Sequence, residues 1–115
     1  MTTPIPISGV AASPGIVIAK AFVAEADDYV PVRASAANPA AEEARLDAAV
    51  AAARGELERI RDDAAARLGP DKAEIFEGHL LLLEDPDLLD GIREKLAADG
   101  VTAEYALHET AQGFV

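Results

Sequence analysis

The sequence has 115 residues, of which half are hydrophobic and only 4% aromatic, and it carries a formal net charge of −11. This charge argues against nucleic acid and anionic membrane surfaces as partners, because both attract basic proteins. The sequence contains no cysteine, which excludes disulfides and zinc–thiolate sites, and neither a signal peptide nor a membrane span is predicted. We therefore expect one cytoplasmic domain at most, acidic either to stay soluble or to bind a basic protein.

The first predicted element is a short β-hairpin. Residues 5–10 and 16–24 are rich in β-branched side chains, and Ser13-Pro14-Gly15 between them is typical of a turn. A phosphate-binding loop is the weaker interpretation, because no glycine-rich loop leads from strand to helix. Two strands alone are marginal in water, so residues 1–30 are expected to be the first strands of an incomplete α/β domain.

A linker over residues 31–38 and a long helix from 39 to 68 follow. Asn38 is a good N-cap, and proline is favoured at the first helical position, which Pro39 would occupy. Apolar residues recur every three or four positions, as in an antiparallel helix pair: Leu46, Val50, Ala53, Leu57, Ile60 and Ala64. Gly69-Pro70 is expected to end this helix and turn the chain back as a helical hairpin.

The apolar segment 73–87 predicts a second helix that breaks near Glu84–Asp85, because Pro86 removes a backbone donor. One packed face is expected to contain Ile75, Phe76, His79, Leu82 and Leu83, and a second apolar surface Leu80 and Leu81. Gly78 is expected to mark a bend or a close backbone approach. His79 is interpreted as a hydrogen-bonded core histidine and not as a catalytic residue.

Two further helices complete the prediction. Leu88, Leu89, Ile92 and Leu96 continue an apolar stripe to a stop at Asp99-Gly100. Thr102 is expected to cap a last helix with Glu104 in its first turn. Glu104 and His108 are spaced i,i+4, which we interpret as helix packing and not as a metal site. The fold class is therefore mainly α: an antiparallel helical hairpin or bundle over residues 39–115.

No catalytic or metal-binding residue is predicted. Carboxylates gather around the second helix and its break, namely Asp71, Glu74, Glu77, Glu84, Asp85 and Asp87. They form either a solvated surface or an acidic docking surface, and nothing in the sequence indicates the burial that would shift their pKa values for acid–base work. Composition alone does not choose between these two interpretations.

Two segments at characteristic spacing carry a family resemblance. I-S-G-V-A-A-S-P-G-I at residues 7–16 and I-F-E-G-H-L-L-L-L-E-D-P-D-L at residues 75–88 resemble the amino-terminal part of enzyme I of the sugar phosphotransferase system, a phosphoenolpyruvate–protein phosphotransferase. V-T-A-E-Y-A-L-H-E-T at 101–110 fits as well. We expect this sequence to be roughly the first fifth of such an enzyme, since residues 111–115 also contain no clear helix terminator.

The resemblance implies a separate role for each part of the complete enzyme. In that family an α/β part carries the phosphorylated histidine, an inserted helical part docks the histidine phosphocarrier protein, and a carboxy-terminal barrel binds phosphoenolpyruvate and magnesium. A homodimer through the missing half is also implied. The family's active histidine lies in a Gly-Gly-x-x-Ser/Thr-His-type segment, which is absent here, and neither His79 nor His108 matches it. The expected docking residues are Asp71, Glu74, Leu81, Leu82, Asp85, Asp87 and Leu88.

Two other hypotheses remain open. The sequence could be the equivalent segment of a related multi-domain phosphotransferase, such as the dihydroxyacetone-kinase phosphoryl donor. It could also be a stand-alone acidic helical adaptor without catalysis. The strand-forming start and the end of the sequence without a terminator favour the fragment of a phosphotransferase over the adaptor.

Overall fold

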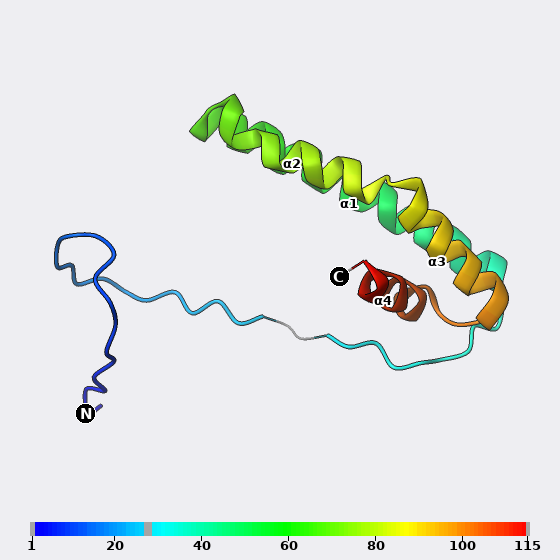
Figure 1. Ribbon diagram of the computed structural model, residues 1–115, viewed down its shortest axis with the longest axis horizontal. Helices are drawn as coiled ribbons and strands as arrows, with labels where there is room; N and C mark the ends of the chain where they lie inside the picture. Colours follow the sequence, from blue (N-terminus) through cyan, green and yellow to red (C-terminus); the bar gives the residue numbers. More distant parts are fainter. Residues whose placement is uncertain (1, 27–28, 115) are drawn as a thin grey trace.

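The computed structural model describes residues 2–26 and 29–114, and its ordered part is an assembly of helices. In chain order these are α1 (Pro39–Leu68), α2 (Pro70–Leu83), α3 (Pro86–Asp99) and α4 (Ala103–Gly113). Figure 1 shows α1 and α2 side by side along the long arm of the molecule, with α3 continuing beyond α2 and α4 lying beside the lower part of α1. The predicted mainly α fold is confirmed. None of the helices in the described residues is long and apolar enough to cross a membrane.

The ends of α1 lie where the sequence predicts them. The side-chain oxygen of Asn38 accepts hydrogen bonds from the backbone N–H groups of Ala40 at 3.1 Å and Ala41 at 3.4 Å. Gly69 has a φ of +95°, a backbone conformation that glycine adopts without a side-chain clash. This single residue connects α1 to α2 and therefore fixes them as a tight antiparallel hairpin.

Along the arm, α1 and α2 pack against each other mainly through small side chains. The buried residues there are Ala64, Ala73 and Leu80. Ion pairs of 2.9 Å flank this interface, one between Arg61 and Glu77 and one between Arg54 and Glu84. The hairpin is thus held by a narrow apolar contact with charged pairs beside it.

The predicted packed face of α2 is wrong in part. Ile75 and Leu82 are 61% and 57% exposed, whereas Leu80 is only 8% exposed and packs inward. Nearly every side of this helix carries apolar residues, so their spacing did not single out one face. Ala73 and Leu80, seven residues apart, are the stripe that fits against the alanine-rich surface of α1.

The break between α2 and α3 is confirmed. α2 ends at Leu83, α3 starts at Pro86, and Asp85 between them is the N-cap of α3. The Asp85 carboxylate accepts a hydrogen bond of 2.8 Å from the backbone N–H of Asp87. This local cap lets the chain change direction at the proline without leaving that donor unsatisfied.

The hydrophobic core lies where α3 and α4 meet the first half of α1. It consists of Leu46, Ile92, Leu96, Val101, Ala103 and Ala106. Ile92 and Val101 are each only 1% exposed, and Ala106 is completely buried. The core is thin, as the alanine-rich composition predicts, and it gathers at one end of the hairpin.

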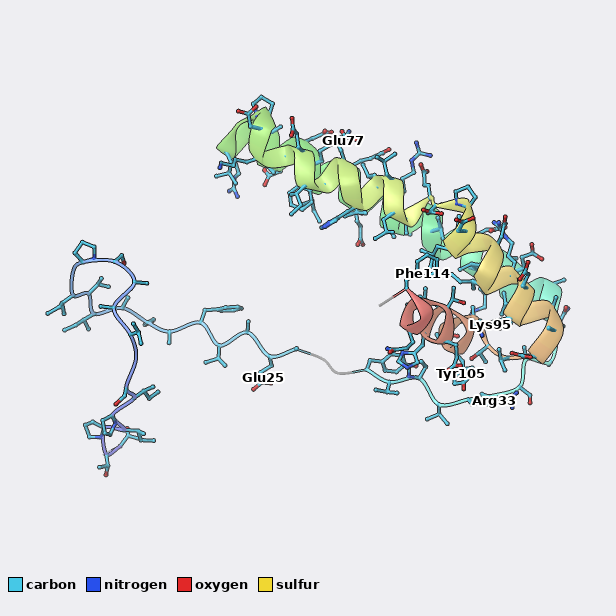
Figure 2. The ribbon with its side chains drawn as sticks, viewed as in Figure 1. Glu25, Arg33, Glu77, Lys95, Tyr105 and Phe114 are labelled. Carbon is cyan, nitrogen blue, oxygen red and sulfur yellow. The ribbon has the colours of Figure 1, made fainter. Side chains whose placement is uncertain are left out.

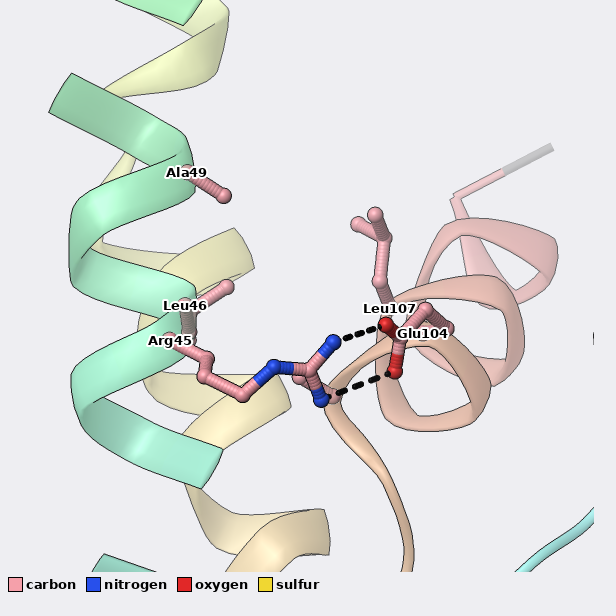
Figure 3. A pocket seen from close by; sticks show the side chains of 6 residues that line it. Arg45, Leu46, Ala49, Glu104 and Leu107 are labelled. Atoms are coloured by element: carbon pink, nitrogen blue, oxygen red, sulfur yellow. Dashed lines mark hydrogen bonds and ion pairs between the residues drawn. The ribbon is translucent and has the colours of Figure 1, made fainter. Parts of the chain in front are cut away.

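A polar cluster attaches the start of α4 to α1 (Figure 3). Thr102 occupies the N-cap position, but its side chain makes no capping hydrogen bond. Instead Glu42 of α1 accepts a hydrogen bond of 2.8 Å from the backbone N–H of Ala103. Arg45 pairs with Glu42 at 2.7 Å and also with Glu104 of α4. Glu42 therefore caps a helix that begins 61 residues later in the sequence.

The segment before α1 has more structure than the predicted linker. Ser35 and Val101 form an antiparallel bridge. The N–H of Ala36 donates to the carbonyl of Gly100 at 2.7 Å, and the N–H of Thr102 donates to the carbonyl of Ala34 at 3.1 Å. These bonds tie the segment to the turn between α3 and α4.

The expected β-hairpin near the N-terminus is not formed. Residues 2–26 contain no strand, only a bend at 12–14 around the predicted turn. Their apolar side chains project into solvent, with Ile16 98% and Phe22 92% exposed, and Figure 2 shows this segment extended away from the helices. The physical reason is that a two-stranded ribbon buries too little surface to be stable without further strands.

The close approach of α3 to α4 generates a first prediction. A Cβ at Gly91 would lie 3.1 Å from the methyl group of Thr110. Thr110 is buried and its hydroxyl donates to the Ala106 carbonyl at 2.8 Å, so the methyl cannot turn away. Gly91→Ala should lower the free energy of unfolding by roughly 1–2 kcal/mol, although alanine favours helix. Urea denaturation followed by circular dichroism measures this.

Two controls accompany this prediction. Gly91→Ala combined with Thr110→Ser removes the clashing methyl and should recover most of the loss. Gly55→Ala in α1, where a Cβ meets nothing within 4 Å, should instead add about 0.5–1 kcal/mol. A stabilising effect of Gly91→Ala alone would contradict the close packing of α3 on α4.

The Glu42 cluster generates a second prediction, on pH. The pKa of Glu42 is lowered from its usual value, mainly by the Ala103 N–H and then by Arg45, and Arg45 also lowers the pKa of Glu104. A lowered carboxylate pKa stabilises the fold above the usual glutamate pKa, and this contribution is lost as the pH falls through the folded-state pKa. Glu42→Gln should therefore destabilise the protein near neutral pH, with a smaller difference from wild type at about pH 3, on the acid side of the usual glutamate pKa.

Urea denaturation at both pH values is the measurement. Glu56→Gln, on the exposed side of α1, serves as the control because Glu56 takes part in no ion pair within the described residues. It should match the wild type at both pH values. A Glu42→Gln difference that stays constant down to about pH 3 would refute the carboxylate cap.

Candidate functional site

The side of α2 that faces away from α1 carries exposed apolar and acidic residues. Leu81 is 75% and Leu82 is 57% exposed, and Asp71 and Glu74 are exposed on the same side. Residues spaced i, i+3, i+4 and i+7 share one face of a helix, which brings these four together opposite the buried stripe of Ala73 and Leu80. Four of the seven predicted docking residues thus form one surface.

Two further residues complete this surface. Ile75 is 61% exposed and not packed as predicted, and Gly78 lies at the centre of the surface. The predicted close backbone approach at Gly78 is wrong, because a Cβ there would meet nothing within 4 Å, and α2 continues unbroken through the predicted bend. The helical spacing of three, four and seven residues between Asp71 and Leu82 places both Ile75 and Gly78 on this surface. We call this surface the outer face of α2; its residues are Asp71, Glu74, Ile75, Gly78, Leu81 and Leu82.

The other three predicted docking residues lie at the break between α2 and α3. Asp87 is exposed, whereas Asp85 is half-buried and uses its carboxylate to cap α3. Leu88 is half-buried, packs against the core, and lines an apolar groove of about 180 Å³ between α1, α3 and α4. Leu88 is therefore not part of the outer face, while Asp87 adds an exposed carboxylate near its end.

The acidic residues around α2 divide into two groups. Glu77 and Glu84 pair with arginines of α1, so their charge is matched within the hairpin. Asp71, Glu74 and Asp87 take part in no ion pair among residues 2–26 and 29–114. The exposed carboxylates of the outer face are therefore not neutralised by a described cation and face solvent.

The two histidines lie on different helices, His79 on α2 and His108 on α4. His79 is exposed and makes an edge-to-face contact with the ring of Phe76, with centroids 5.9 Å apart at 87°. The predicted core histidine is thus wrong, because His79 is exposed to solvent and only Phe76 beside it is half-buried. His108 is half-buried on α4, and Glu104, four residues before it, binds Arg45.

No metal site emerges in the part of the chain that the structure describes. That part contains no group of three or more His, Cys, Asp or Glu residues that could hold a metal ion. The cavity beside Arg45 has a volume of about 130 Å³ and is lined mainly by Leu46, Ala49 and Leu107. Glu42 and Glu104 neutralise Arg45 there, which leaves no net positive charge for an anionic ligand. The outer face of α2 is the stronger candidate.

A family model and individual relatives point to the same protein family. Residues 8–115 match the family model described as PEP-utilising enzyme, N-terminal. The phosphoenolpyruvate-protein phosphotransferases of Geobacillus stearothermophilus and Bacillus sp. (strain S) are 52% and 50% identical to this chain over 109 residues, and that of Bacillus subtilis (strain 168) is 45% identical. Each alignment covers 95% of this chain and 19% of the relative. The chain therefore spans about a fifth of the length of these curated relatives.

Proposed function

This chain belongs to the N-terminal family of PEP-utilising enzymes, and we propose that it is the amino-terminal part of an enzyme I of the sugar phosphotransferase system. The complete enzyme would pass a phosphoryl group from phosphoenolpyruvate to its own histidine and then to the histidine phosphocarrier protein. The part played by this chain is to dock the phosphocarrier. It does not transfer the phosphoryl group by itself, because the active-histidine segment that the resemblance implies is absent from the sequence.

The outer face of α2 is the observation that supports docking. Leu81 and Leu82 are large and exposed, yet burial of Ala73 and Leu80 already accounts for the packing of α2. Exposed leucines beside unpaired carboxylates suit a partner with a basic and partly apolar patch, which the resemblance implies for the phosphocarrier. The leucines supply buried apolar area, and the carboxylates steer the encounter and set its orientation.

Docking of this kind contributes to phosphoryl transfer through geometry. The donor histidine of the enzyme and the acceptor histidine of the phosphocarrier must approach in line, and holding two proteins together turns a bimolecular step into an effectively unimolecular one. The rigid arm of α1 and α2 would provide a fixed platform for this. The chemistry itself would take place on histidines outside this chain.

The remaining parts of the proposal follow from the family. Residues 2–26 would supply strands to the α/β part of the complete enzyme, which would be a cytoplasmic homodimer. Magnesium would bind with phosphoenolpyruvate at the carboxy-terminal barrel; the described residues offer no fitting group of ligands, and no step proposed for this chain involves a metal. A stand-alone adaptor is less well supported, since the relatives are about five times longer.

The apolar part of the outer face generates a third prediction. Leu81→Ala together with Leu82→Ala should weaken binding of the unphosphorylated histidine phosphocarrier roughly 10-fold or more, because both side chains would be buried in the complex. Stability should change little, since both leucines are exposed in the free protein. Isothermal titration calorimetry measures the affinity. Ile60→Ala, an exposed apolar residue of α1 outside this face, should bind as the wild type does.

An NMR titration of the labelled chain with the same phosphocarrier locates the contact. Chemical shift changes should centre on residues 71–88. A folded wild-type chain whose spectrum does not change on addition of the phosphocarrier would overturn the proposed function.

The carboxylates of the outer face generate a fourth prediction. Asp71→Asn with Glu74→Gln should slow association with the phosphocarrier about 3- to 10-fold at low ionic strength, because long-range attraction speeds the encounter. The difference from wild type should shrink in about 0.5 M salt, where the Debye length is short. Stopped-flow kinetics measures both rates. Glu56→Gln on α1 is the control, and a salt-independent difference would contradict electrostatic steering.

A further inference from the structure

We propose that Gly78 is a specificity determinant of the outer face: its missing side chain leaves a recess that accepts a bulky apolar side chain of the partner. This inference rests on the proposed function and adds to it the shape that the partner must present. The candidate emerges because Gly78 is an unfavourable residue in the middle of a helix and no described residue lies close enough to its Cβ position to require a glycine there.

The fold does not need a glycine at this position. Gly78 lies inside the uninterrupted helix α2, and it is not among the glycines with positive φ. A Cβ built on Gly78 would meet nothing within 4 Å, in contrast to Gly91, whose Cβ would press on Thr110 of α4. A side chain at position 78 would therefore point into open space on the outer face.

The neighbours of Gly78 give the recess its chemistry. Positions three and four residues away on a helix surround a residue on the surface, and here they are Glu74, Ile75, Leu81 and Leu82. A side chain at position 78 would fill the space between these four neighbours, and glycine leaves that space open. Ile75, Leu81 and Leu82 give the resulting recess exposed apolar walls.

A second mid-helix glycine shows that the surroundings matter. Gly55 of α1 also has nothing within 4 Å of its Cβ position, but it lies beside charged residues: Glu58 and Arg59 follow it, and Arg59 donates to the Gly55 carbonyl. No exposed apolar walls surround it. Because the recess at Gly78 has apolar walls and lies beside Asp71 and Glu74, the partner that fits it presents a large apolar side chain. Basic residues around that side chain would face the two carboxylates.

The test compares Gly78→Ala, Gly78→Leu and Gly55→Ala in the full chain, by titration with the unphosphorylated histidine phosphocarrier. Filling a well-packed recess is costly, so Gly78→Ala should weaken binding about 3- to 10-fold and Gly78→Leu roughly 30-fold or more. Thermal unfolding should show that Gly78→Ala is as stable as the wild type or more stable, because alanine favours helix. Gly55→Ala should gain the same stability and bind like the wild type.

The outcomes separate this inference from the proposed function. A wild-type chain that binds the phosphocarrier, with both Gly78 variants binding equally well, would overturn the recess and leave docking intact. A folded wild-type chain that does not bind would overturn the proposed function and this inference with it. Weaker binding by the stable Gly78→Ala variant, with Gly55→Ala unchanged, would establish the recess.

Discussion

The packing of α3 and α4 against the first half of α1 is the contact on which the rest of the structure depends. Ile92 and Val101 are almost completely buried there. The arm formed by α2 and the second half of α1 instead packs mainly through small side chains such as Ala64 and Ala73. Alanine buries little apolar area, so the arm is held by a narrow apolar contact, by the ion pairs of Arg54 and Arg61 beside it, and by the tight connection at Gly69. The core anchors the molecule, and the arm extends from it as a helical pair.

This arrangement explains why α2 has large apolar residues to spare. An interface built from alanines brings two helices close together without needing leucines on both sides. Leu80 alone faces inward among the leucines of the segment from 80 to 82, so Leu81 and Leu82 stay in solvent. A helix that packs through its small residues can present its large ones to a partner, which is the property a docking surface requires.

Local signals made the helix boundaries predictable, whereas the faces of α2 and the contacts between distant segments were not. Asn38, Gly69 and Pro86 each act on the backbone next to them, so their effects could be derived from the sequence alone. α2 is apolar on nearly every side, so its spacing supported several packed faces, and four residues of the outer face were predicted without Ile75. The cap that Glu42 gives to α4 depends on segments 61 residues apart. The N-terminal strands required pairing partners that local propensity does not supply.

The hydrogen bonds around Ser35 determine where a pulling force on the N-terminal segment would reach the helices. Ala34 and Ala36 are hydrogen-bonded to the turn between α3 and α4, so the N-terminal segment leaves the helices at the core, at the opposite end of α1 from Gly69. Tension applied through residues 2–26 would reach the backbone of that turn and the start of α1 together. The arm lies outside this line of force, so the outer face would keep its shape while the N-terminal segment is pulled or moved.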